Sequence, residues 1–211
     1  MKIGVNARWL IKPFTGIGQY TENLFRELAK IDSGNEYVLV VPEEVDVKFG
    51  KNVRVEILKE KRLGTAGMKK TWWEQIQVPE FFLKEKVDVV FFTYPCNPWS
   101  GDWYKKGVKT IVTVHDCIPW VRKEYRRGVL SKMYHRQTRK AVGKADVVLT
   151  VSESSKKEIV KICDVGKGKV KVVYNDAGDV YKKSGGDDKK VLEKWGLKKD
   201  KYFLYVGGYD V

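Results

Sequence analysis

Short apolar runs, separated by polar or amphipathic stretches, limit most strongly what this chain can fold into. They predict strands over residues 2–6, 37–41, 53–57, 87–92, 110–114, 145–151, 169–174 and 202–206. Helical spacing of apolar residues predicts helices over about 17–30, 72–83, 126–143, 154–163 and 188–195, the second with Pro79 as a point where it can kink. Strands alternating with helices predict an α/β fold: a doubly wound, mostly parallel, Rossmann-like sheet with helices on both faces.

The same pattern divides the chain. Residues 1–178 are predicted to form the Rossmann-like domain, and residues 179–200 a polar linker with a short helix. The apolar run 202–206 is followed by Gly207 and Gly208, so residues 201–211 are predicted to carry the first strand of a second domain.

The charge balance points to anionic partners. Lysine and arginine total 41 against 27 acidic residues, a formal net charge of +14. Nucleic acid, an acidic membrane surface and phosphorylated substrates all fit such an excess. No nucleic-acid motif or basic–aromatic repeat is present, so we expect no nucleic-acid partner. The basic run from Arg122 to Lys140 fits either an anionic membrane surface or a solvated helix face, and the sequence leaves both open.

Cysteine and histidine usage argues against disulfides and metal sites. Cys96, Cys117 and Cys163 are odd in number, widely spaced and without a C-x-x-C pair, which indicates free thiols. With only two histidines, His115 and His135, no metal-ligand spacing is found. No signal peptide or membrane-spanning run is found either. We therefore expect a cytoplasmic protein, with peripheral attachment to a membrane as an option.

The loop Gly16-Ile17-Gly18 joins the first strand to the first helix. Glycines let a backbone approach a ligand closely, and the unpaired amides of a helix start favour an anion. The alternative is a tight turn that binds nothing, because the third glycine of the dinucleotide fingerprint is missing. Other loops predicted to follow strand ends should converge with it, since ligands of such sheets sit outside the carboxyl ends of the strands.

His115, beside Asp116 at a strand end, could orient a hydroxyl or share a proton; packing at the strand mouth is the alternative. Ser152 and Glu153 could contact a ligand or simply cap a helix. The candidate catalytic residues are His115 and Asp116. The candidate substrate-binding residues are Gly16, Ile17, Gly18, Tyr20, Tyr94, Ser152, Glu153 and Asn175.

The order of motifs resembles the N-terminal half of a group 1, family 4 retaining glycosyltransferase of the GT-B fold, of the mannosyltransferase-like kind. The motifs are NAR at 6–8, TGIGQYTENL at 15–24, TVHDCIP at 113–119, ADVVLTVSESS at 145–155, KVKVVYN at 169–175 and YFLYVGG at 202–208. The resemblance covers essentially the whole chain.

This resemblance implies two Rossmann-like domains around a cleft, the first mainly receiving the acceptor and the second mainly holding a nucleotide-sugar. Gly16 and Gly18 match the loop that approaches the donor diphosphate, and His115 matches the histidine near the transferred sugar. Ser152 and Glu153 match a motif lining the same cleft. The resemblance also implies catalysis without a metal or cofactor. The co-substrate would be a GDP- or UDP-linked sugar, and the leaving diphosphate would be stabilised by basic side chains and helix amides.

In relatives, a basic pair and a glutamate-bearing segment follow the 202–208 motif, and neither is found before Val211. We therefore expect an acceptor-side half, inactive alone, that serves a glycan or lipid-linked acceptor and takes nucleotide-sugar only with a second domain. The alternative is a non-catalytic basic module that docks on an anionic membrane or on a partner subunit carrying the donor domain. An oxidoreductase is disfavoured by the glycine spacing and by the lack of a clear acidic ribose-binding residue after the second strand.

Overall fold

The computed structural model describes residues 1–61, 64–99, 106–178, 188–199 and 201–205 of the chain. It separates into two compact units, Met1–Asn175 and Asp176–Val211.

Seven parallel strands form one sheet in the first unit, as predicted, in the order β3-β2-β1-β4-β5-β6-β7. The strands are β1 Lys2–Asn6, β2 Glu36–Val41, β3 Val53–Ile57, β4 Val89–Phe92, β5 Lys109–Thr113, β6 Val147–Thr150 and β7 Val170–Val172. The strand order reverses between β1 and β4, where a doubly wound sheet opens a crevice at its carboxyl edge.

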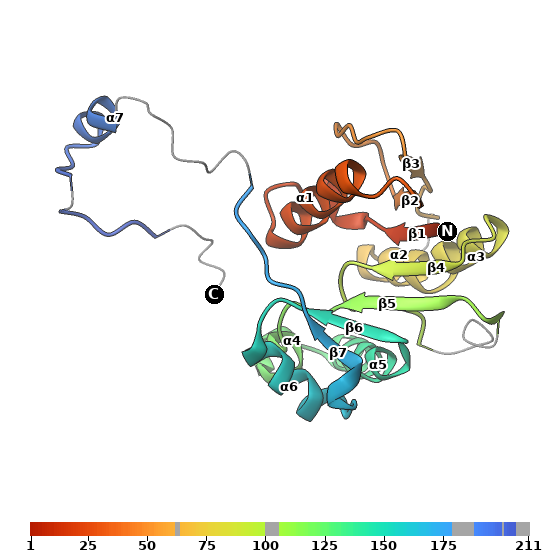
Figure 1. Ribbon diagram of the computed structural model, residues 1–211. Coiled ribbons are helices and arrows are strands. Elements are labelled where there is room, and N and C mark those ends of the chain that lie inside the picture. Colours follow the sequence, from red (N-terminus) through yellow and green to blue (C-terminus); the bar gives the residue numbers. More distant parts are fainter. Residues whose placement is uncertain (62–63, 100–105, 179–187, 200, 206–211) are drawn as a thin grey trace. The chain divides into compact units, whose positions relative to one another are not determined.

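Helices follow β1, β3, β5 and β6 and cover both faces of the sheet (Figure 1). The α-helices are α1 Gly16–Ile31, α2 Ala66–Trp72, α3 Val78–Lys84, α4 Ile118–Val121, α5 Val129–Lys144 and α6 Glu153–Cys163. Short 3-10 turns lie at η1 Arg8–Ile11, η4 Lys123–Tyr125 and η5 Lys167–Lys169, and a π-helical turn at η2 Trp73–Gln77.

Two apolar cores result, one on each face. Phe25 of α1 belongs to the core on one face together with Leu39 and Phe91, and Trp73 and Ile159 belong to the core on the other. Because successive strand side chains point to opposite faces, a strand covered on both sides needs a continuous apolar run, which β2 has.

Two predicted helices differ in detail from the observed ones. The helix predicted over 72–83 extends from Ala66 to Lys84 and contains the π turn η2 directly before Pro79. Proline lacks an amide and its ring clashes with the carbonyl four residues earlier, so the widened turn accommodates it within a continuous helical segment. The helix predicted to start at 126 starts at Val129, because Gly128 adopts φ +78° and ends the preceding loop.

In the second unit, α7 Asp188–Lys194 corresponds to the helix predicted over 188–195. Gly196, at φ +63°, ends it, and the Leu197 amide donates to the Leu192 carbonyl over 2.8 Å. Residues 202–205, within the strand predicted over 202–206, have no regular secondary structure. Residues 179–187 and 206–211 of the predicted linker and second domain lie outside the described residues.

All three cysteines are buried and free. Within the described ranges, no helix is long and apolar enough to cross a bilayer.

Candidate active site

The two glycines of the Gly16-Ile17-Gly18 loop have different surroundings. Thr15 caps α1 by accepting a hydrogen bond from the Gly18 amide over 3.2 Å. A β-carbon on Gly18 would lie 2.4 Å from the Lys12 carbonyl oxygen, so this glycine is needed for α1 to pack on the preceding turn. A β-carbon on Gly16 would meet no atom within 4 Å. The open side of the loop is therefore at Gly16.

Tyr20 lies one turn into α1, and its ring contacts the ring of His115, which lies beyond the end of β5. Their ring centroids are 4.7 Å apart and the rings are nearly perpendicular. The Tyr20 hydroxyl is 3.1 Å from Thr113 Oγ1, and burial raises the pKa of this phenol. The structure thus joins the start of α1 to the histidine. Sequence reasoning missed Thr113, because its only distinguishing feature was a polar side chain at the end of an apolar strand.

The environment of His115 fixes its protonation. Its Nε2 lies 3.0 Å from the carbonyl oxygen of Thr93, the residue after β4. A carbonyl oxygen only accepts hydrogen bonds, so we assign the proton of the neutral ring to Nε2, which leaves Nδ1 as an acceptor. Burial lowers the pKa of His115, while the bond to Thr93 and the charge of Asp116 partly oppose that shift. Neutral His115 can therefore accept a hydrogen bond from a ligand hydroxyl through Nδ1.

Two serines at the start of α6 hold the His115 backbone. Ser152 caps the helix: its Oγ accepts from the Ser155 amide and donates to Ser155 Oγ, each over 3.1 Å. Ser155 Oγ in turn donates to the His115 carbonyl over 3.1 Å. Ser152 thus serves as the cap that its sequence suggested and is connected to His115 through Ser155, which sequence reasoning had not selected.

The remaining polar candidates contribute less to this cluster. Asp116 is exposed and accepts from the Ile118 amide over 2.8 Å, at the start of α4. Glu153 is exposed in the first turn of α6. Asn175 is exposed at the last position of the first unit. The structure does not bring Asn175 into contact with His115.

Tyr94 faces the core instead. It is only 4% exposed, and its hydroxyl donates to Glu74 Oε1 over 2.6 Å. Tyr134 donates to the other oxygen of Glu74 over 3.1 Å, and Lys70 Nζ lies 3.6 Å from this carboxylate. The Lys70 ammonium also lies 5.4–5.9 Å from the ring centroids of Trp9, Tyr94 and Tyr134. Sequence reasoning missed this group, because residues so distant in the chain give no local signal.

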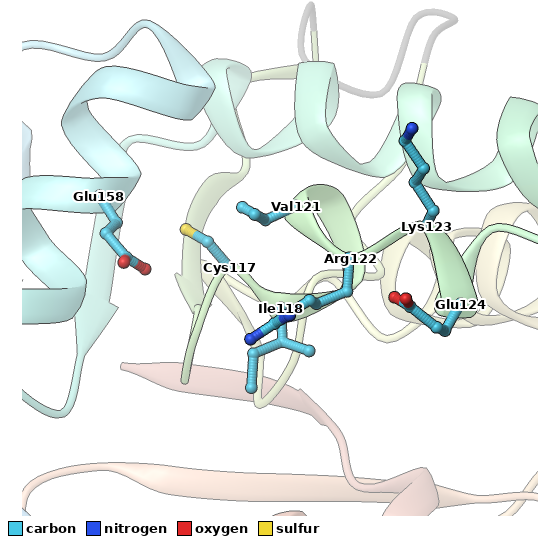
Figure 2. Close-up of a pocket in the computed structure, with 7 residues that line it drawn as sticks. All are labelled: Cys117, Ile118, Val121, Arg122, Lys123, Glu124 and Glu158. Atoms are coloured by element: carbon cyan, nitrogen blue, oxygen red, sulfur yellow. The ribbon is translucent and has the colours of Figure 1, made fainter. Parts of the chain in front are cut away.

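A cavity of about 470 Å³ lies beside α4 and α6. Figure 2 shows Glu158 on α6 facing the segment that carries Cys117 and Ile118. Burial raises the pKa of the Cys117 thiol to about 12, so the thiol stays protonated. The cavity is lined by none of the residues predicted as candidate site residues.

The fold is similar to those of several solved structures. Sucrose-phosphate synthase from Thermosynechococcus elongatus matches with a TM-score of 0.66 at 13% identity, over 95% of this chain and 53% of that one. HepE from Anabaena in complex with UDP-glucose matches with a TM-score of 0.57 at 13% identity, over 93% and 50% of the two chains. The apo lipopolysaccharide outer core galactosyltransferase WaaB matches with a TM-score of 0.54 at 13% identity, over 84% and 46%.

These likenesses show the fold, and the chain spans about half the length of the structures it matches. Among curated proteins, a sequence search finds no match. A family model described as Glycosyltransferase Family 4 matches residues 14–175, a segment that contains the glycine loop, His115 and the α6 cap. The chain therefore belongs to glycosyltransferase family 4.

Proposed function

We propose that the chain is the acceptor-side half of a retaining, mannosyltransferase-like glycosyltransferase. It would pass a sugar from a GDP- or UDP-sugar to a glycan or lipid-linked acceptor. The observation that carries this proposal is the contact of Tyr20 with His115 beside the start of α1, at the carboxyl edge of the sheet. Family membership supports it, and the UDP-glucose in the HepE structure makes a UDP-sugar a suitable probe.

The start of α1 would receive negative charge. Among the described residues, the amides of Gly16 and Ile17 have no acceptor, whereas the Gly18 amide donates a hydrogen bond to the Thr15 side chain. Two free amides at the positive end of a 16-residue helix suit a diphosphate oxygen. Charge that develops on the leaving diphosphate would be met there and by basic side chains, with no metal or cofactor.

His115 would position the sugar or the acceptor. Its Nδ1 can accept from a hydroxyl, while Thr93 and Ser155 hold the ring and the backbone in place. Tyr20 packs edge-on against the ring and limits its rotation. A rigid, neutral acceptor of this kind orients a hydroxyl without first losing a proton.

Photolabelling of the full chain tests the proposal. With 5-azido-UDP-glucose at millimolar concentration, at which weak binding by the isolated chain still occupies the site, we expect the label in the peptide containing Gly16 and Tyr20, reduced by excess UDP-glucose. Labelling should fall in His115→Gln and persist in the control Lys157→Glu, an exposed change on α6. Label that is distributed over many peptides and is not reduced by UDP-glucose would contradict the site. Equal labelling of the two variants would contradict it as well.

The isolated chain should transfer no sugar from UDP-glucose or GDP-mannose, and its affinity for either should be too weak for a micromolar Kd. A micromolar Kd by calorimetry, or turnover by the chain alone, would contradict the assignment of most donor binding to a second domain.

A further inference from the structure

A second cavity, of about 290 Å³, lies between α4 and α5, and neither Tyr20 nor His115 lines it. Its lining is one aromatic side chain and five basic ones: Trp120, Arg126, Lys132, His135, Arg136 and Arg139. The helix α5 supplies four of them at helical spacing, so they share one face of that helix.

Within the part of the chain that the structure describes, the cations of this cavity have no acidic partner. No acidic residue lines it, and none of Arg126, Lys132, Arg136 and Arg139 forms an ion pair with a residue that the structure describes. Such a concentration of like charge in a concave site raises the local concentration of anions.

One of these cations has an unused donor. Arg126 Nη2 donates to the Val121 carbonyl over 3.3 Å, but Arg126 Nε is shielded from solvent and has no acceptor among the described residues. A shielded donor without an acceptor is unfavourable, and a ligand oxygen in the cavity would relieve it.

We propose that this cavity binds the phosphate group of an anionic ligand. Arginine guanidinium groups present several donors in a fixed fork that matches phosphate oxygens, and the lysine adds a point charge. Trp120 forms the apolar wall, held in place by a hydrogen bond from its Nε1 to Thr138 Oγ1 over 3.3 Å.

His135 adds a donor that depends on pH. Its pKa is lowered, first by burial and then by the charges of Lys70 and Arg126, while a hydrogen bond with the Tyr125 backbone opposes the shift. The negative charge of a bound phosphate would offset the repulsion between these cations and a protonated His135. Phosphate binding should therefore strengthen as His135 becomes protonated.

Exposed apolar side chains next to the basic residues in the chain favour a lipid headgroup as the source of the phosphate. None of them lines the cavity; the four on the η4–α5 segment, here called the rim, are exposed by 51% at Tyr125, 81% at Val129, 70% at Leu130 and 51% at Met133. Val129 is at helical spacing from Lys132 and Arg136, so it shares their face of α5. Apolar side chains interleaved with cations suit the boundary between headgroups and acyl chains. A soluble phosphorylated compound would use the cavity but not the rim.

Two binding assays on the full chain separate these sources. Calorimetry with inorganic pyrophosphate reports phosphate binding without the rim, and co-sedimentation with vesicles of phosphatidylcholine and phosphatidylglycerol reports the cavity and rim together. Pyrophosphate can also bind the start of α1, so only the part of its binding that the site variant removes is assigned to the cavity. The site variant is Lys132→Glu/Arg136→Glu, and its matched control is Lys157→Glu/Lys161→Glu on α6; all four residues are exposed. The rim variant is Val129→Ser, with the exposed Ile31→Ser as its control.

We expect the site variant to lower affinity for both probes by at least about tenfold, since each cation near an anionic surface contributes about fivefold. The α6 control should change affinity by less than about threefold because of salt screening. With a lipid source, Val129→Ser weakens vesicle binding and leaves pyrophosphate binding unchanged. If the chain binds pyrophosphate but not vesicles, and the site variant abolishes pyrophosphate binding, the site is supported and its ligand is a soluble phosphorylated compound. Equal losses in the two charge-reversal variants, or no binding of either probe, would overturn the proposal.

Discussion

At the scale of single residues, the glycine loop shows how two identical residues can have opposite requirements. Gly18 is buried against backbone carbonyls, whereas Gly16 is exposed and borders empty space. Where a glycine has room for a side chain, packing does not require it, and its backbone can be approached by a ligand. Where there is no room for a side chain, packing itself requires the glycine. The sequence alone could not separate them, because the turn η1 that crowds Gly18 was not predicted.

Substitution by alanine should distinguish the two glycines. Gly18→Ala should lower the free energy of unfolding by about 1–3 kcal/mol, since the new methyl group meets carbonyl oxygens that belong to the backbone. Gly16→Ala should be neutral or stabilising by up to about 1 kcal/mol, as alanine favours a helix. Urea denaturation checks both values, and a loss at Gly16 as large as that at Gly18 would refute the distinction.

The protonation state of His115 is also testable. Because burial lowers its pKa, the ring should be neutral at pH 7 with its proton on Nε2, and should titrate below 6.5. Asp116 raises this pKa, so Asp116→Asn should lower it further, while His135 serves as an internal control that does not change. Proton and nitrogen NMR of the two rings measures this, and a pKa of His115 that rises in the variant would contradict the assignment.

At the scale of elements, a buried carboxylate joins three parts of the chain. Glu74 lies in the π turn η2, Tyr94 follows β4, and Tyr134 lies on α5. Carboxylates buried without partners are costly, and here two hydroxyls and an ammonium provide them. The helix around Glu74 was predictable from its apolar spacing, but this contact was not, since it depends on how separate helices pack on the sheet.

Loss of Glu74 should therefore destabilise the unit strongly. Glu74→Ala should cost about 3–5 kcal/mol, because it leaves the Lys70 ammonium and two tyrosine hydroxyls without their acceptor. Glu27→Ala, which breaks the exposed pair with Lys30, should cost less than about 1 kcal/mol. Equal effects in chemical denaturation would show that the buried group adds nothing beyond a surface pair.

At the scale of the whole molecule, the strand pattern predicted the parallel sheet and the helices on its two faces. Continuous apolar runs such as that of β2 indicate strands covered on both faces, and their short length and flanking turn residues distinguish them from buried helices. The convergence of α1, β5 and α6 on His115 followed from the rule that loops at carboxyl ends meet. The core position of Tyr94 and the tight packing at Gly18 did not follow, because both depend on tertiary contacts that no local pattern encodes.

Stability of the chain should fall as the solution is acidified from about pH 7 to about pH 5. The pKa values of both histidines are lowered in the folded state, so the unfolded chain binds more protons over this range. The stabilising contribution of the two neutral histidines is complete above about pH 6.5 and is lost as the pH falls through their pKa values in the folded state. Thermal unfolding across this range measures the effect, and His115→Gln should reduce the slope. A melting temperature that rises on acidification would contradict it.

A titration followed by proton–nitrogen NMR tests most directly whether the carboxyl edge of the sheet is the substrate site. With millimolar UDP-glucose added to the full chain, the amides of Gly16 and Ile17 and the His115 ring should shift together. Gly166 and Gly168, in the loop that precedes β7 at the opposite edge, should not move. Unchanged Gly16 and His115 signals, or larger shifts at Gly166 and Gly168, would contradict the placement of the site.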